Sequence, residues 1–190
     1  MSSIYLNLAG PLQSWAGPSV LKTRVDTKRE PSERAIRGLL MAAFGVPRGK
    51  SQPEEISDAR IEISTLNQGR VVRDFQIVGD RSDEELFLER LGRIFVLGNR
   101  AWGGHASPDS RGMNKIVNRT YLGDAQFIVK ITGKTEEETF KIFSMLQKPT
   151  WDLYLGKKAF PATFPFLLGV FSSEEEAMAR LKEIEDKQSE

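Results

Sequence analysis

The sequence predicts an α+β fold: a ferredoxin-like βαββαβ core with a short C-terminal β/helix extension. The predicted elements follow the order strand, helix, strands, then strand and helix, which is the order of the split βαβ motif. A chain of 190 residues can bury such a core without disulfide or metal staples. We assign residues 1–148 to the domain and residues 149–190 to the extension.

The first strand and the first helix are recognised by their ends. Residues 3–9 alternate in polarity as a strand does, and Gly10-Pro11 ends them. A loop is predicted over 11–31. A helix is predicted over 33–44, because Ser32 can cap its start and a glycine follows its end. Its apolar stripe consists of Ile36, Leu39, Leu40, Ala43 and Phe44.

The middle of the chain predicts two pairs of strands. Residues 59–66 and 70–78 are predicted to be joined by a hairpin-like turn at Asn67-Gln68-Gly69. Residues 115–131 predict a broken strand pair. Between these pairs, the stretch 80–114 begins with a segment that fits a helix or a strand. It ends in an irregular loop rich in Gly, Ser, Asn and Pro.

Two capping boxes predict two further helices. Thr135 with Glu138 opens one helix, and Ser173 with Glu176 opens the last one. We expect the first of these helices to end at Pro149. The expected core-facing residues are Phe140, Phe143 and Leu146 in the first, and Ala177, Leu181 and Ile184 in the second.

Composition excludes several functional classes. The chain has no cysteine and a single histidine, so disulfides, thiolate metal sites and a cysteine nucleophile are excluded, and a structural zinc site is not expected. The N-terminal residues lack the basic and apolar regions of a secretory signal, and no apolar stretch is long enough to span a membrane. We therefore expect a cytoplasmic protein with no membrane partner and no metal or other cofactor.

Positive charge is concentrated in two blocks of the chain. Residues 1–50 carry eight Lys and Arg against three acidic residues, and residues 99–134 carry six against two. Acidic residues outnumber basic ones in 51–98 and in 173–190. If folding brings the two basic blocks together, they form a phosphate-binding surface; the alternative is that the charges are scattered over the surface.

The residues that could support catalysis are few. His105 could act as an acid or base in metal-independent RNA cleavage, with Lys115 stabilising the developing phosphate charge. A solvated or RNA-contacting imidazole is the alternative. The carboxylates show no diagnostic metal spacing, Ser14 does not lie in a nucleophile elbow, and no phosphate-binding P-loop motif is present.

Nucleic-acid binding has more candidates, because cations alternate with aromatic rings. Rings can stack on unpaired bases while Arg and Lys follow the phosphates. The candidates in the first half are Gly10, Gln13, Ser14, Trp15, Arg24, Lys28, Arg34 and Arg37. Those in the second half are Arg100, Trp102, Arg111, Lys115, Arg119, Tyr121, Lys157 and Lys158. For Trp15 and Tyr121 the alternative is a place in the hydrophobic core.

Five segments resemble one known family. They are LNLAGPLQSWAG at 6–17, PSERAIRGLLMAAFG at 31–45, VVRDFQIVG at 71–79, NRTYLGDAQFIVKI at 118–131 and PTWDLYLGKKAFPATFPFLLG at 149–169. In this order they are similar to the N-terminal signature, first helix, central strands and closing motif of the Cas-five family of CRISPR-associated proteins, in particular to its type I-E branch. The matches extend over nearly the whole chain.

The resemblance implies an RRM-type palm with a thumb inserted at about 80–114. It also implies a non-catalytic Cascade subunit that binds the single-stranded five-prime handle of CRISPR RNA and caps one end of the surveillance complex. The implied partners are a backbone subunit and the large subunit, with target DNA contacted only indirectly. By position, Gly10, Gln13 and Trp15 fall in the loop after the first strand, Arg34 and Arg37 on the helix facing the handle, and Lys157 and Lys158 in the basic turn. Arg100, Trp102 and Arg111 fall in the thumb.

Two other functions remain open at this point. A related branch of the family cleaves its own precursor RNA, which here would require His105. An adaptor whose basic blocks never contact RNA is the third possibility. These three hypotheses predict different behaviour toward a repeat-derived RNA.

Overall fold

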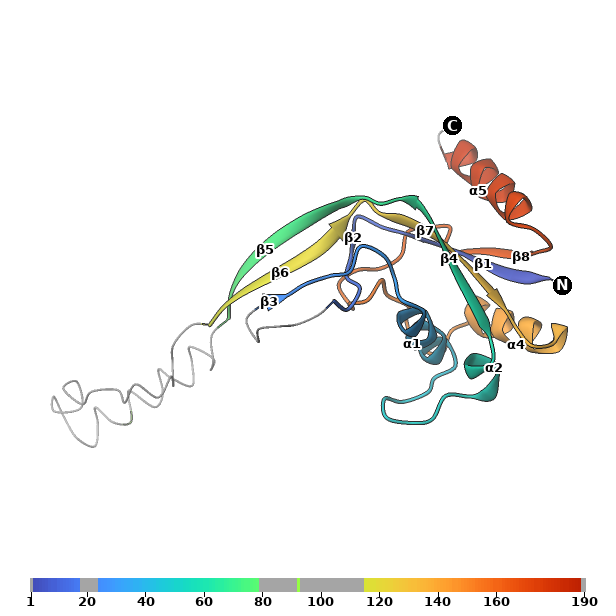
Figure 1. Ribbon diagram of the computed structural model, residues 1–190, viewed down its shortest axis with the longest axis horizontal. Helices are drawn as coiled ribbons and strands as arrows, with labels where there is room; N and C mark the ends of the chain where they lie inside the picture. The colour runs from blue at the N-terminus through green and yellow to red at the C-terminus, as the bar shows by residue number, and fades with distance from the viewer. Residues whose placement is uncertain (1, 18–23, 79–91, 93–114, 189–190) are drawn as a thin grey trace. The chain divides into compact units, whose positions relative to one another are not determined.

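The computed structural model describes residues 2–17, 24–78, 92 and 115–188 (Figure 1). The chain divides into two compact units. The first unit is drawn from Met1–Pro18, Asp26–Val72 and Thr120–Glu190, and the second from Ser19–Val25 and Arg73–Arg119. The predicted thumb at 80–114 lies outside the described residues, apart from Gly92.

The first unit contains a four-stranded antiparallel sheet. Its strands, in spatial order, are β4 (Arg60–Asn67), β7 (Gln126–Thr132), β1 (Ser3–Ala9) and β8 (Leu167–Phe171). With helices α1 (Glu33–Ala43) and α4 (Glu136–Gln147), the chain order β1-α1-β4-β7-α4-β8 confirms the ferredoxin-like core. Strand β8 comes from the segment that the sequence analysis assigned to the extension, so this segment completes the sheet.

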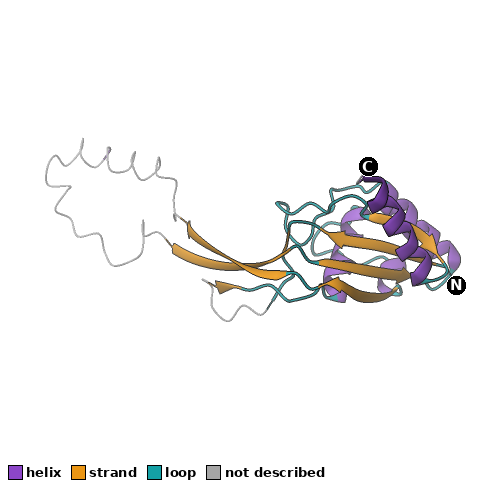
Figure 2. Ribbon diagram, turned by 90° about the horizontal axis from the view of Figure 1, so that it is seen from above, coloured by secondary structure: helices purple, strands orange, loops and turns teal. Residues whose placement is uncertain are grey.

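Successive side chains of a strand point to opposite faces of the sheet, so the core consists of two clusters, one on each face. Ile4, Leu6 and Leu8 of β1 face one side and join the cluster that includes the helices α1 and α4. Tyr5, between them, faces the other side and packs with residues of α5 (Glu174–Gln188). Figures 1 and 2 accordingly show α5 across the sheet from α1 and α4. The period of two in a strand thus produces a sheet covered on both faces.

The helix starts are confirmed. Ser32 accepts a hydrogen bond from the amide of Ala35, and Thr135 accepts one from Glu138 at 3.2 Å. Ser173 accepts one from Glu176 at 3.4 Å. Helix α1 ends one residue before the predicted boundary.

The core face predicted for α4 is partly wrong. Its buried residues are Thr139, Ile142 and Leu146, while Phe140 is 54% exposed. The hydroxyl of Thr139 accepts from the amide of Gly133 and donates to the carbonyl of Thr135, which places Thr139 on the inner side. Each helical residue is rotated by about 100° from the next, so the neighbouring Phe140 is turned toward solvent.

The turn at 67–69 does not close a hairpin, which corrects the prediction. Strand β4 pairs with β7, whereas β5 (Arg70–Val78) pairs with β6 (Lys115–Gly123) of a second sheet. The predicted break in 115–131 falls at Asp124, between β6 and β7, where φ is 56°. In each predicted pair the two strands therefore belong to different sheets: β4 and β7 lie in the first sheet, and β5 and β6 lie in the second.

Three short elements complete the described chain. Strand β2 (Leu12–Gln13) pairs antiparallel with β6, and β3 (Arg24–Val25) pairs parallel with it. A single-turn helix, α2 (Glu54–Ser57), precedes β4. None of the described helices combines the length and the apolar composition needed to cross a bilayer.

Candidate nucleic-acid interface

The first and the last of the recognised motifs meet in the first unit. The amide of Ser14 donates to the carbonyl of Leu155 at 3.0 Å, and the amide of Thr163 donates to the carbonyl of Ala9 at 2.9 Å. Gly156 has a φ of +90°, and a Cβ there would lie 1.7 Å from the carbonyl oxygen of Ser14. The loop 10–17 and the turn 154–163 therefore lie in direct contact, and only glycine fits at the contact.

The turn that carries the two lysines is closed by its own backbone. Leu155 donates to the carbonyl of Phe160 at 2.8 Å, and Phe160 donates to that of Lys157 at 2.9 Å. Tyr154 and Pro161 form a bridge at its base. The backbone positions of both lysines are thus fixed before any ligand arrives.

The two lysines differ in their contacts. The Lys157 ammonium donates to the Tyr121 hydroxyl at 3.2 Å and lies 4.5 Å from the centre of the Tyr121 ring. The Lys158 side chain is exposed and, within the described residues, makes no hydrogen bond or ion pair. Lys157 is held by its aromatic neighbour, whereas Lys158 is available to an external phosphate.

Two of the three predicted stacking rings, Trp15 and Tyr121, are buried, which corrects that part of the prediction. Trp15 is 2% exposed and Tyr121 is 7% exposed. The indole of Trp15 donates to the side-chain oxygen of Gln13 at 3.0 Å, and the Gln13 amide donates to the carbonyls of Leu8 and Ala125. Trp15 and Gln13 thus lock the loop from inside, the alternative that the sequence had left open for the ring.

Segments of the two basic blocks lie side by side in this unit. Lys28 donates its amide to the carbonyl of Trp15 at 2.8 Å, and its side chain is exposed. The Thr27 hydroxyl bonds both the amide and the carbonyl of Trp15, and the Thr27 amide donates to the hydroxyl of Thr120. Thr120 belongs to the second basic block, residues 99–134, so this hydrogen bond joins segments of the two blocks. Nothing in the sequence distinguished these two threonines in advance.

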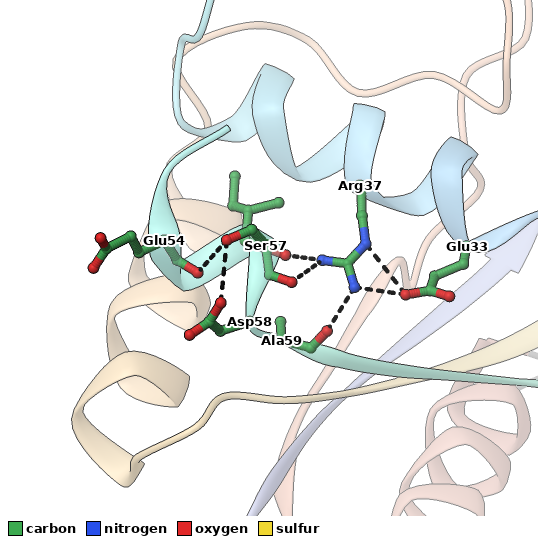
Figure 3. Close-up of polar contacts among 7 residues, drawn as sticks. Glu33, Arg37, Glu54, Ser57, Asp58 and Ala59 are labelled. Carbon is green, nitrogen blue, oxygen red and sulfur yellow. Dashed lines mark hydrogen bonds and ion pairs between the residues drawn. The ribbon is translucent and has the colours of Figure 1, made fainter. Parts of the chain in front are cut away.

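Arg37 is not a free phosphate ligand, contrary to the prediction. Figure 3 shows its guanidinium turned toward backbone carbonyl groups at the end of α2 and in the link from α2 to β4. It donates to the carbonyls of Ile56, Ser57 (3.1 Å) and Ala59 (2.9 Å), and it pairs with Glu33 at 2.5 Å. All of these groups belong to the protein itself, so the guanidinium has a structural role.

Arg34, one turn earlier on α1, is exposed and has no ion pair or hydrogen bond to any residue that the structure describes. It lies in the first turn of the helix, where the free backbone amides add partial positive charge. Arg34 therefore remains a candidate ligand for a phosphate.

The second unit contains three further candidates. Arg24 lies on β3 opposite Asn118 of β6, and Lys115 and Arg119 lie on β6 itself. The Nε atom of Arg119 is buried and, among the described residues, has no hydrogen-bond partner. The structure thus places these cations on neighbouring strands. The predicted candidates Arg100, Trp102 and Arg111, and the alternative catalytic residue His105, lie outside the described residues.

Within the interface, burial and a hydrogen bond to Asp152 raise the pKa of Tyr154, at the base of the turn. Other shifted pKa values belong to groups elsewhere in the fold. The hydrogen bond from Lys134 lowers the pKa of Asp58, and the one from Lys141 lowers the pKa of Glu55. Burial raises the pKa of Tyr5, beneath α5. These groups stabilise the fold. No group of three potential metal ligands occurs in the part of the chain that the structure describes.

Comparison with known proteins gives a consistent family assignment. A family model described as CRISPR-associated protein (Cas_Cas5) matches residues 3–189. The CRISPR system Cascade subunit CasD of Escherichia coli (strain K12) is 29% identical over 189 residues, which are 95% of this chain and 76% of CasD.

Two solved structures share the fold. One chain, from a structure described as a CRISPR RNA-guided surveillance complex, has a TM-score of 0.65 and 27% identity, and the match covers 88% of this chain. The match spans 62% of that chain's own length. A second, described as a Cas protein, has a TM-score of 0.58 and 22% identity over 93% of this chain and 69% of its own, and it shows the fold alone.

Proposed function

The chain belongs to the Cas5 family of CRISPR-associated proteins, and on this premise we propose that it is a Cascade-type subunit that binds the five-prime handle of CRISPR RNA. The similarity to the E. coli Cascade subunit CasD, and to a chain of a solved surveillance complex, supports this proposal. The bound RNA end caps one end of the complex and sets the register of the subunits beside it. No chemical step is assigned to this chain.

The observation that carries the proposal is the contact between the loop 10–17 and the basic turn at Gly156. This contact fixes Lys158 on a closed turn and places the Lys157 ammonium against an aromatic face. Lys28 is tied to the same loop through Trp15. Phosphate contacts of this kind fix the position of a strand, and a rigid site binds with a smaller loss of conformational entropy.

The partners follow from the same proposal. The single-stranded handle is the RNA ligand, and a backbone subunit and the large subunit are the protein neighbours. Target DNA is contacted only through the assembled complex. Arg34 extends the RNA surface toward the start of α1, where exposed backbone amides favour an anion.

The test is the salt dependence of handle binding. The full-length protein is titrated against a fluorescein-labelled handle RNA by anisotropy at several salt concentrations. We expect a steep decrease in affinity with salt, because each neutralised phosphate of a single strand contributes about −0.7 to the logarithmic slope. Lys158→Met should lower the affinity and make the slope shallower by about that amount.

Lys182→Met is the matched control, because Lys182 is an exposed lysine of α5, on the other side of the sheet from α1 and α4. It should bind RNA like the wild-type protein. Wild-type binding that does not change with salt would contradict the proposal and favour a protein adaptor. Equal losses of RNA affinity in Lys158→Met and Lys182→Met would show that the basic turn is not part of the binding site.

A further inference from the structure

An exposed aromatic ring adjoins the basic turn. Phe164 is 74% exposed, the most exposed of the large apolar side chains that the structure describes. Single exposed apolar residues are common on protein surfaces, so exposure alone indicates no function. The backbone around this ring and the charges beside it distinguish it from an ordinary surface residue.

The backbone on both sides of Phe164 is anchored to β1. Thr163 donates its amide and its hydroxyl to the carbonyl of Ala9, at 2.9 and 3.0 Å. The buried Asn7 donates its side-chain amide to the carbonyl of Pro165 at 3.1 Å and its backbone amide to that of Phe166 at 2.8 Å. The Cα of Phe164 is therefore held rigidly at the end of the strand that leads into the loop 10–17.

The ring is also close to the lysines along the chain. Pro161 closes the base of the basic turn by its bridge to Tyr154, and Phe164 is the third residue after it. Three residues span at most about 10 Å when fully extended. Lys158 precedes Phe164 by six residues, so their Cα atoms are at most about 20 Å apart, the length of a few nucleotides of a single strand.

Of the rings that the sequence suggested for base stacking, Trp102 lies outside the described residues, and the other two are not accessible to a base. Trp15 and Tyr121 are buried, so the described part of the interface has cations but no exposed ring among the predicted residues. Proteins that hold single strands combine a cationic track with aromatic platforms, and Phe164 supplies the missing component. Resting on the function proposed above, we infer that Phe164 stacks on an unpaired base of the strand whose phosphate lies on Lys158.

The surroundings favour a nucleobase over a protein partner as the occupant. A protein interface has a contiguous apolar core of several residues. The other large exposed apolar residues of the described chain are Leu66, Val71, Phe75, Phe140 and Trp151, and none belongs to the loop 154–166. The other large apolar residues of that loop, Leu155, Phe160 and Phe166, are buried or half-buried, and the chain neighbours of Phe164 are Thr163 and Pro165. A lone ring beside cations fits one base and its phosphate.

The test compares three substitutions of this ring in full-length protein, with handle RNA as the probe. Phe164→Ala should weaken binding by roughly 5- to 150-fold, the range that corresponds to one stacked base. Phe164→Leu should lose about as much, because it is apolar but has no ring, while Phe164→Trp should bind at least as tightly as wild type. The salt slope should stay unchanged in all three, since no phosphate contact is removed.

Phe140→Ala is the control, because Phe140 is a similarly exposed ring on α4, and its affinity should equal that of wild type. Wild-type affinity in Phe164→Ala, with a loss in Lys158→Met, would overturn the stacking inference and leave the handle-binding function standing. If neither Phe164→Ala nor Lys158→Met changes binding, the stacking inference and the role of the basic turn are both refuted, and the salt dependence of the wild type alone decides the handle-binding function. A Phe164→Ala protein that binds RNA normally but no longer enters the complex would assign the ring to a protein interface instead.

Discussion

The contacts of Arg37 give a quantitative prediction for the stability of the fold. Arg37→Met keeps most of the aliphatic stem and removes the guanidinium, which bonds the carbonyls of Ile56, Ser57 and Ala59 and pairs with Glu33 (Figure 3). The bonds to Ile56 and Ala59 are partly buried, and each contributes roughly 1 kcal/mol. The exposed bond and ion pair add about 0.5 kcal/mol together. The free energy of unfolding should fall by about 2–3 kcal/mol.

Urea unfolding followed by circular dichroism measures this loss. A decrease of this size also lowers the melting temperature by about 4–12 °C in a chain of this length. Arg34→Met is the matched control: it removes an exposed arginine of the same helix, and its free energy of unfolding should equal that of wild type within about 0.5 kcal/mol. If the two variants unfold at the same midpoint, the structural role of Arg37 is refuted. The RNA affinities should follow the opposite order: Arg34→Met should lose more affinity than Arg37→Met, because Arg34 is the exposed candidate for a phosphate contact.

Other contacts give further tests. Gly156→Ala should destabilise the protein by about 2–4 kcal/mol in denaturant titrations, because its φ is +90° and its Cβ would overlap the Ser14 carbonyl; an unchanged midpoint would refute this contact. The ion pair of Lys134 lowers the pKa of Asp58, so its stabilisation is present above the ordinary carboxyl pKa and lost as pH falls through the folded value. The difference in melting temperature between wild type and Lys134→Met should therefore be measurable at neutral pH and vanish well below about pH 4. Finally, the wild-type protein should leave a repeat hairpin RNA intact on gels, and His105→Ala should bind as wild type does; cleavage that requires His105 would establish the enzymatic alternative.

Local signals in the sequence predicted most of the core. The capping residues Ser32, Thr135 and Ser173 determine where helices begin through bonds to nearby amides, so a sequence window contains the necessary information. The apolar pattern mispredicts the face of α4, because it selects the hydrophobic Phe140 and passes over its neighbour Thr139. The position of Thr139 depends on its bonds to Gly133 and Thr135, which a hydrophobic pattern does not contain.

Partner strands were harder to predict than strands. Residues 60–67 and 70–78 are strands as expected, yet they pair with β7 and β6 and not with each other. A three-residue link of polar residues and glycine has the composition of a hairpin turn whether or not the chain folds back. Pairing depends on β6 and β7, which lie far along the sequence, so no local pattern could reveal it.

The site shows the same limit for individual side chains. The two motif segments that the sequence singled out, the loop 10–17 and the turn 154–163, do meet in the structure. The motifs could not separate Lys158, which is exposed, from Lys157, which is held against Tyr121. Nor could they show that Trp15 is buried, since the bond from its indole to Gln13 exists only in the folded loop. Charge and aromaticity indicate that a segment can bind, whereas burial decides which atoms do.

This division of roles has a consequence for how the motif works. Gly156, Gln13 and Trp15 make contacts inside the protein, so their identities serve to hold the loop and the turn together. An RNA end that sets the register of neighbouring subunits must be held in one position, and a loop ordered in advance does not lose its conformational entropy again on binding. Substitutions of the internal residues should therefore reduce stability and affinity together. Substitution of the exposed Lys158 should reduce affinity alone, because its ammonium makes no hydrogen bond or ion pair within the described chain.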